Sequence, residues 1–151
     1  MNQAGASRFS WPVRVYYEDT DIGGVVYYAN YLKFFERART EWLRALGFDQ
    51  FKFAQQEDRA FVVRRAEIDY RRAARMDDLL KVSVLPLEGG RASLWVAQQI
   101  VREYPNANQV ELIAEAKIQV ACVRRSDGVP VKLPALIFDH LQPTLMPAKE
   151  P

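Results

Sequence analysis

An aspartate, a nearby glycine and the start of a helix form the group of residues that could do chemistry. Asp21 follows a predicted strand and an acidic turn, and Gly24 allows the backbone to approach a ligand closely. A long helix is predicted to begin soon afterwards, and free N–H groups at a helix start carry partial positive charge. A carboxylate beside such groups can attack a carbonyl, or activate water against it, while they hold the carbonyl oxygen. The pattern predicts a nucleophile or general base with an oxyanion hole, and this chemistry requires no histidine.

The spacing alone leaves two interpretations of this turn open. An Asp-Thr-Asp-x-x-Gly turn, here over residues 19–24, is more often a hydrogen-bonded loop than an active site. In the catalytic interpretation, the carboxylate is ionised at neutral pH but is a weak nucleophile and a weak base. Thioesters are the natural target for such a group, because a thiolate leaves easily.

The composition narrows the chemistry further. The 151 residues suit one domain, and a formal charge of +2 is weaker than a nucleic-acid binder usually shows. The one cysteine, Cys122, excludes an intrachain disulfide, and the one histidine, His140, excludes metal sites built on several histidines. Cys122 lies in an apolar strand and is predicted to be a buried, inert thiol. We expect neither a metal nor a redox cofactor.

Targeting and membrane segments are not expected. Residues 1–13 lack the apolar stretch of a secretory signal, and the uncharged apolar stretch over 22–32 is too short to cross a bilayer. These patterns favour a soluble, cytoplasmic protein. We expect a flexible leader over 1–10, one folded domain over 11–141 and a proline-rich disordered tail over 142–151.

Hydrophobic periodicity predicts the elements that must position the aspartate. Alternation over 12–17 predicts a strand before the acidic turn. Asn30 is the predicted N-cap of a long helix that ends at Gly47, with an apolar face of Leu32, Phe35, Ala38, Trp42, Leu43 and Leu46. The segment 48–59 is compatible with a short helix or a loop. Four antiparallel strands and a short helix are predicted to follow, over 61–70, 79–87, 92–103, 110–125 and 130–140.

This order of elements predicts an α+β fold. The bulky side chains of Phe35 and Trp42 on the helix need a cover, and a curved sheet with one apolar face would provide it. The other face of the sheet and its edges would then be free for a second subunit.

Long stretches of the sequence resemble a known enzyme family. The segment VRVYYEDTDIGGVVYYANYLKFFERARTEWLRALGF is similar to the YbgC-type acyl-CoA thioesterases, which belong to the 4-hydroxybenzoyl-CoA thioesterase family. The resemblance continues through FVVRRAEIDYRRAARMDDLLKVSV, GRASLWVAQQIV and EAKIQVACV, and it covers residues 10–135 approximately. The segment D-x-D-x-x-G-x-V-x-x-x-x-Y within so complete a match is specific, whereas the same letters alone are not.

The resemblance implies a fold, an assembly and a site. It implies the hotdog fold, in which a curved antiparallel β-sheet wraps a long central helix, and a homodimer with continuous sheets that commonly forms a homotetramer. Active sites then lie at the subunit interface and hydrolyse an acyl-CoA substrate. The family's catalytic carboxylate falls on Asp21, its carbonyl-polarising backbone amide on Tyr28 and its glycine on Gly24. Tyr31 matches the last tyrosine of the motif, as a packing residue or a substrate-binding one.

Two further residues are candidate substrate contacts, and two positions depart from the family. Basic residues near the turn at 89–90 contact the CoA phosphates in the family, which makes Arg91 a candidate, with a solvated hairpin arginine as the alternative. Lys132 is a weaker candidate of the same kind. Many members have histidine in place of Tyr28; the exchange keeps the backbone amide but loses an imidazole, and a phenol holds its proton at neutral pH. Ala73 stands where the family often shows proline, and we expect little effect.

Two functions from different classes are compatible with these residues. In the first, the protein hydrolyses acyl-CoA thioesters, with Asp21 as nucleophile or general base and the Tyr28 amide holding the carbonyl oxygen. In the second, it is a low-turnover module that binds acyl carrier protein or phospholipid-synthesis enzymes, since YbgC-type proteins are associated with the Tol-Pal envelope system. Intact Asp21 and Gly24 favour the first function. A hotdog dehydratase is a third alternative, for which His140 is poorly placed.

Overall fold

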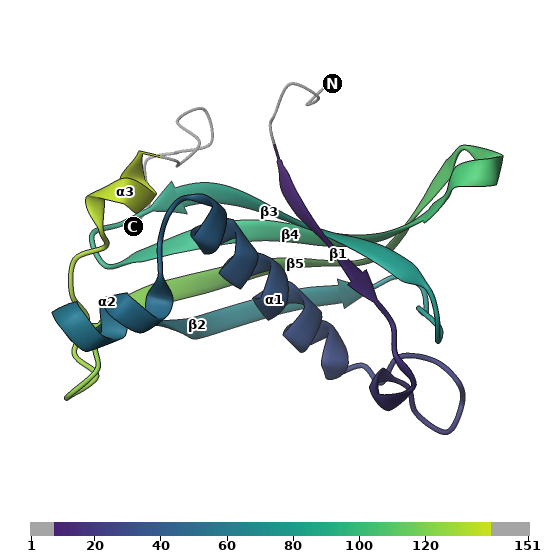
Figure 1. Cartoon of the computed structure of the whole chain (residues 1–151), viewed down its shortest axis with the longest axis horizontal. Coiled ribbons are helices and arrows are strands. Elements are labelled where there is room, and N and C mark those ends of the chain that lie inside the picture. The colour runs from purple at the N-terminus through teal and green to yellow at the C-terminus, as the bar shows by residue number, and fades with distance from the viewer. Residues whose placement is uncertain (1–7, 140–151) are drawn as a thin grey trace. The chain divides into compact units, whose positions relative to one another are not determined.

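The computed structural model describes residues 8–139, which contain five strands and three α-helices (Figure 1). The predicted tail and His140 fall outside these residues, as do positions 1–7 of the predicted leader. The strands are β1 (Phe9–Arg14), β2 (Arg59–Tyr70), β3 (Leu79–Gly89), β4 (Ser93–Tyr104) and β5 (Gln109–Arg124). The helices are α1 (Asn30–Ala45), α2 (Gln50–Glu57) and α3 (Ala135–Phe138), with short 3-10 turns at η1 (Tyr17–Asp19) and η2 (Pro105–Ala107).

The five strands form one antiparallel sheet in the order β1-β3-β4-β5-β2, so that β1 and β2 occupy its two edges. The four later strands lie within two residues of their predicted bounds. β1 begins at Phe9 rather than within the predicted segment 12–17, because Phe9 pairs with Val84 and the register continues to Arg14 opposite Leu79. That long-range pairing extends the strand into residues whose composition is typical of a leader.

The chain folds into two compact units. The first comprises Met1–Trp42, Ile68–Val84 and Gln98–Ala116, and the second comprises Leu43–Glu67, Leu85–Ala97 and Lys117–Pro151. β1, the loop after it and most of α1 belong to the first unit, whereas α2 and α3 belong to the second. The other four strands contribute residues to both.

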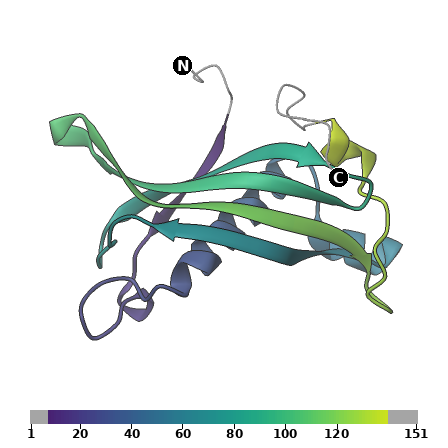
Figure 2. The same ribbon diagram turned by 180° about the vertical axis from the view of Figure 1, so that it is seen from behind.

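Within the first unit, α1 packs one apolar stripe on one face of the sheet, and the opposite face is seen from behind in Figure 2. The stripe contains the fully buried side chains of Phe34, Phe35 and Ala38. The strands supply the opposing core, which includes Val13, Leu80, Val82, Val84, Ile100 and Ile113. Leu32 is 44% exposed, so its predicted place on the buried face is wrong. The stripe passes instead through Tyr31 and Phe34, since each step along a helix turns the side chain by about 100°.

A buried glutamine fixes α1 to the sheet within this unit. The Gln98 side chain is 1% exposed, and its Nε2 donates to the carbonyl oxygens of Phe35 at 3.1 Å and Ser83 at 3.2 Å. Its Oε1 accepts a hydrogen bond from Nη1 of Arg39 at 3.0 Å. Burial lowers the pKa of Arg39, an effect that Glu36 opposes. Both polar atoms of the Gln98 amide are therefore hydrogen-bonded, and these bonds orient α1 without leaving a buried amide unpaired.

The second unit has an aromatic core beneath α2. Gly47 adopts a φ of +90° after α1, as predicted for the residue that ends the helix. The segment after it forms α2, capped by the Asp49 side chain, which accepts a hydrogen bond from the Lys52 N–H at 3.1 Å. The rings of Phe48, Phe53 and Phe61 lie 4.5–5.6 Å apart. Cys122 is fully buried, as predicted, and burial raises the pKa of its thiol.

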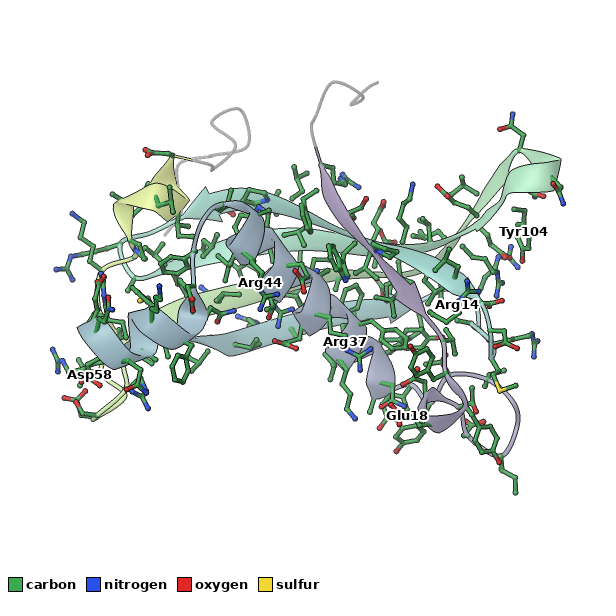
Figure 3. All side chains as sticks on the ribbon, viewed as in Figure 1. Arg14, Glu18, Arg37, Arg44, Asp58 and Tyr104 are labelled. Atoms are coloured by element: carbon green, nitrogen blue, oxygen red, sulfur yellow. The ribbon has the colours of Figure 1, made fainter. Side chains whose placement is uncertain are left out.

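The β4–β5 hairpin extends beyond its neighbouring strands, with Tyr104 near its end (Figures 1 and 3). Arg102 holds the base of this hairpin in the first unit: its guanidinium contacts Asp78 at 2.5 Å and Glu111 at 2.6 Å. Burial alone would lower the pKa of Arg102, but the hydrogen bonds to Glu111 and Asp78 outweigh it, so the pKa is raised. The hydrogen bond from Arg102 also lowers the pKa of Glu111.

Replacing Arg102 with methionine is expected to lower the Tm by several degrees at neutral pH, because Glu111 and Asp78 lose their shared cation. Since the pKa of Glu111 is lowered in the folded state, its stabilising effect is present above its unfolded pKa and is lost as pH falls through the folded value. The Tm gap between wild type and variant is therefore expected to be full above about pH 5 and to shrink towards about pH 3. Thermal melts across this range measure it, with Arg65→Met, an exposed arginine 3.8 Å from Glu67, as the control. A gap that stays constant down to pH 3 would contradict the assignment.

Candidate active site

The loop between β1 and α1 is anchored to the first unit at both ends. The Val15 N–H donates to the Asp78 carbonyl at 2.9 Å, and the Asp77 N–H donates back to the Val15 carbonyl at 2.9 Å. Further along, the Val26 N–H donates to the Ala74 carbonyl at 2.8 Å. Residues 16–25 thus form a loop, and the residues at both of its ends are hydrogen-bonded to the segment just before β3.

Asp21 lies at the turn of this loop with an exposed carboxylate. Its N–H donates to the Val25 carbonyl at 2.9 Å, and its carbonyl accepts a hydrogen bond from the Gly24 N–H at 2.9 Å. One carboxylate oxygen, Oδ1, accepts a hydrogen bond from the Gly23 N–H at 2.8 Å. Among residues 8–139, no cation forms an ion pair with Asp21, and Oδ2 accepts no hydrogen bond. The carboxylate is held at one oxygen and is open to solvent at the other.

Two glycines, Gly23 and Gly24, shape the turn. The sequence pattern predicted a role for Gly24 alone. Gly24 has a φ of +81°, a conformation that glycine adopts without strain. Gly23 was not predicted to be functional, yet its N–H is the donor that holds the carboxylate. A Cβ at Gly23 would lie 3.2 Å from Oδ1 of Asp21, so a side chain there would press on the carboxylate. The adjacent pair Gly23-Gly24 was the one feature of the sequence that could have indicated a role for Gly23.

Tyr28 lies two residues before α1 and presents an unpaired N–H. The flanking groups are bonded: the Tyr27 N–H donates to the Asp19 carbonyl at 3.0 Å, and the Asn30 N–H donates to the Tyr27 carbonyl at 2.8 Å. No group within the described part of the chain accepts a hydrogen bond from the Tyr28 N–H. The Tyr28 side chain is 61% exposed, with the Tyr70 ring 6.1 Å away edge-on. The first unit therefore contains an open carboxylate and a free N–H on one hydrogen-bonded loop.

Tyr31 is a buried packing residue, three positions after Tyr28 in the sequence. Its side chain is 4% exposed, and its hydroxyl accepts a hydrogen bond from the Ala74 N–H at 3.1 Å. Its ring contacts those of Phe34 and Tyr70, with centroids 6.0 and 5.6 Å away. Burial raises the pKa of the Tyr31 hydroxyl. Of the two interpretations of this residue, the contacts support packing.

The two candidate phosphate contacts belong to the second unit, whereas Asp21, Gly24, Tyr28 and Tyr31 belong to the first. The Leu133 N–H donates to the Arg91 carbonyl at 2.9 Å, which brings the backbone of the segment 130–134 beside Arg91. Arg91 and Lys132 are both exposed. Neither side chain forms an ion pair with a carboxylate of the described residues, so both charges are available to an anion.

Asp19 and Asn30 hold the loop together through hydrogen bonds that the sequence pattern did not predict. Asp19 is 5% exposed, and its carboxylate accepts a hydrogen bond from the Tyr16 N–H at 2.8 Å. Asn30 does not act as the predicted N-cap; it is the first residue of α1, and its Nδ2 donates to the Asp19 carbonyl at 2.9 Å. The prediction fails because the side chain finds a main-chain acceptor in the preceding loop rather than an N–H of its own helix.

Within residues 8–139, no cluster of three or more His, Cys, Asp or Glu side chains could hold a metal ion. The helices of the same range are too short or too polar for a membrane span.

Comparison with known proteins identifies relatives for nearly the whole chain. Residues 23–106 match the thioesterase superfamily. The "Acyl-CoA thioesterase YbgC" of Haemophilus influenzae is 45% identical over 137 residues, which cover 89% of this chain and 96% of the relative. The "Acyl-CoA thioester hydrolase YbgC" of Escherichia coli O6:H1 is 46% identical over 129 residues, which cover 85% and 92%.

Solved structures share the fold. A probable thioesterase from Bartonella henselae is 35% identical, with a TM-score of 0.72, over 84% of this chain and 98% of its own. The 4-hydroxybenzoyl-CoA thioesterase from Pseudomonas sp. strain CBS-3 is 18% identical, with a TM-score of 0.80, over 87% and 97%. At that identity the likeness concerns the fold alone. The predicted α+β hotdog fold is confirmed.

Proposed function

Since this chain belongs to the thioesterase superfamily and is a thioester hydrolase, we propose that its substrate is acyl-CoA and that Asp21 and the Tyr28 N–H carry out its chemistry. The predicted resemblance to YbgC-type thioesterases is confirmed by relatives at 45% identity. One observation supports the assignment of the two groups: an open carboxylate and an unpaired N–H lie on one hydrogen-bonded loop before α1.

The Tyr28 N–H donates to the thioester carbonyl oxygen and stabilises the negative charge that develops on it. Asp21 attacks the carbonyl carbon directly, or takes a proton from the water that attacks it. In both courses the carbon–sulfur bond breaks and CoA leaves as a thiolate, which takes up a proton. In the direct course, water then cleaves the anhydride between Asp21 and the acyl group. The products are a free acid and CoA, and the carboxylate of Asp21 is regenerated.

The two glycines adapt the turn to this chemistry. The Gly23 N–H holds Oδ1 of Asp21 and leaves Oδ2 free to attack carbon or to accept a proton. The left-handed conformation of Gly24 closes the turn through its N–H bond to the Asp21 carbonyl. Tyr31 stabilises the packing next to the site through its ring contacts with Phe34 and Tyr70.

We assign the binding of the CoA phosphates to the side chains of Arg91 and Lys132. Both side chains are exposed and are free of ion pairs with the described carboxylates. The Arg91 guanidinium can bind two phosphate oxygens at once, and the Lys132 ammonium adds a point charge. This assignment concerns binding, so loss of either side chain should raise KM rather than lower kcat.

We assign the binding of a second copy of the chain to the free edge of β2. This strand has 12 residues at the edge of the sheet, where unpaired backbone groups can bind another strand. Val62 and Val63 are 43% and 50% exposed on it, which is unfavourable for an edge that stays in water. Pairing of two β2 strands would continue the sheet through a homodimer.

The double variant Val62→Glu/Val63→Glu is expected to be monomeric, because pairing of the two strands would then take charged side chains, rather than valines, out of water. Light scattering after gel filtration measures the mass. Val110→Glu, at another valine that is 61% exposed, is the control and should keep the mass of the wild type. If the double variant keeps that mass, the interface lies elsewhere.

Thiol release from a panel of acyl-CoA thioesters tests the proposed function. Acetyl-, butyryl-, palmitoyl- and 4-hydroxybenzoyl-CoA sample short, long and aromatic acyl groups. We expect turnover of at least one of them, and the fastest identifies the acyl class. Negligible turnover across the panel would contradict the proposal and favour binding of an acyl carrier protein instead.

A further inference from the structure

A single carbonyl oxygen connects the two proposed catalytic groups. The Asp19 carbonyl accepts two hydrogen bonds, one from the Tyr27 N–H at 3.0 Å and one from Nδ2 of Asn30 at 2.9 Å. Asp19 lies two residues before Asp21, and the two donors lie on either side of Tyr28. The peptide segment that carries the free N–H is therefore tied to the segment that carries the carboxylate.

The acceptor end of this joint is fixed. The Asp19 carboxylate is buried and accepts a hydrogen bond from the Tyr16 N–H at 2.8 Å, while the Asp19 N–H donates to the Tyr16 carbonyl at 3.0 Å. Thr20 pairs with Val26 in an antiparallel bridge. The Asp19 carbonyl thus has little freedom to move when a donor pulls on it.

The donor end is fixed as well. Asn30 begins α1, and its own N–H donates to the Tyr27 carbonyl at 2.8 Å, which closes a turn around Tyr28. Its side-chain amide then reaches past Tyr28 to Asp19 across 11 positions of sequence. Among residues 8–139, Asn30 is the one residue whose side chain bonds the start of α1 directly to the segment just before Asp21.

We propose that Asn30 is a positioning residue of the hydrolysis, which sets the separation of the Asp21 carboxylate and the Tyr28 N–H through its hydrogen bond to the Asp19 carbonyl. The inference rests on the proposed function of those two groups. Asn30 touches neither the substrate nor the reacting atoms. Its effect is on geometry, and a small displacement of reacting groups can lower a rate about a hundredfold.

The variants Asn30→Asp and Asn30→Ala separate this role from helix capping. Aspartate keeps the size of asparagine and is as good an N-cap, but it has no N–H to donate to a carbonyl. For both variants we expect kcat to fall about 10- to 100-fold, with KM for the preferred acyl-CoA within twofold of wild type. Circular dichroism and thermal melts establish that each variant is folded. Asn106→Asp, at an exposed asparagine of η2, is the matched control for the same change of atoms.

The Asp21→Asn variant, measured in the same assay, distinguishes the two ways of failing. If Asp21→Asn is inactive while folded Asn30→Asp keeps its kcat, the positioning role is overturned and the proposed function stands. If Asp21→Asn keeps its activity, the proposed function is overturned and the positioning role falls with it. A fall in kcat for Asn30→Asp and Asn30→Ala, with KM unchanged and Asn106→Asp unaffected, supports the inference.

Discussion

Replacing Asp21 with asparagine is expected to lower kcat for acyl-CoA hydrolysis about a thousandfold, with little change in KM. The amide is neutral, so it neither attacks the thioester carbon nor takes a proton from water. Its oxygen can still accept the hydrogen bond from the Gly23 N–H, so the turn is expected to keep its shape. Because the carboxylate is exposed and forms no ion pair with the described residues, the Tm should stay close to that of wild type. Steady-state thiol release and thermal melts measure both quantities.

Glu18→Gln is the matched control for this variant. Glu18 is an exposed acid on the same loop, three residues before Asp21 (Figure 3), and its replacement removes the same charge. We expect its kcat to stay within twofold of wild type. Equal losses in the two variants would indicate a general effect of charge on substrate binding and would contradict a chemical role for Asp21.

Replacing Tyr28 with proline is expected to lower kcat about 100- to 1000-fold, because proline has no N–H to hold the carbonyl oxygen. That loss corresponds to about 2.7–4 kcal/mol of transition-state stabilisation. The N–H donates to no described group, so its removal leaves no broken hydrogen bond within residues 8–139. Steady-state thiol release measures kcat, and circular dichroism shows whether the variant is folded.

Tyr28→Phe and Tyr28→Ala keep the N–H and remove the hydroxyl or the whole ring. Both are expected to keep kcat within a few-fold of wild type, since the side chain is 61% exposed and the proposed role belongs to the backbone. A loss in Tyr28→Phe as large as that in Tyr28→Pro would assign the role to the phenol and contradict the assignment to the amide.

Local patterns predicted most of the fold. The extent of α1, the glycine that ends it and the alternation of the later strands depend on neighbouring residues, and each appears close to where it is expected. Features that depend on distant residues were harder to predict. Phe9 belongs to β1 because it pairs with Val84, and Phe34 rather than Leu32 is buried because the sheet lies on that side of the helix.

The same distinction holds for the site. Asp21 and Gly24 stand out in the sequence as a carboxylate and a glycine before a helix start, whereas the family resemblance was needed to choose the backbone amide of Tyr28. The hydrogen bond from Asn30 to Asp19 could not be predicted, since a bond to a main-chain carbonyl leaves no trace in the type of the residue that accepts it. Asn30 satisfies the pattern of an N-cap equally well, and only the position of the Asp19 carbonyl decides between the two roles.

A single-turnover measurement on Asp21→Asn shows whether the carboxylate takes part in the reaction, because it isolates the chemical step from binding and product release. Calorimetric titration of the same variant with the preferred acyl-CoA gives its affinity for intact substrate. We expect an affinity within a few-fold of the wild-type KM and a chemical step slowed about a thousandfold. A single-turnover rate close to that of wild type would contradict the assignment of the reaction to the Asp21 carboxylate.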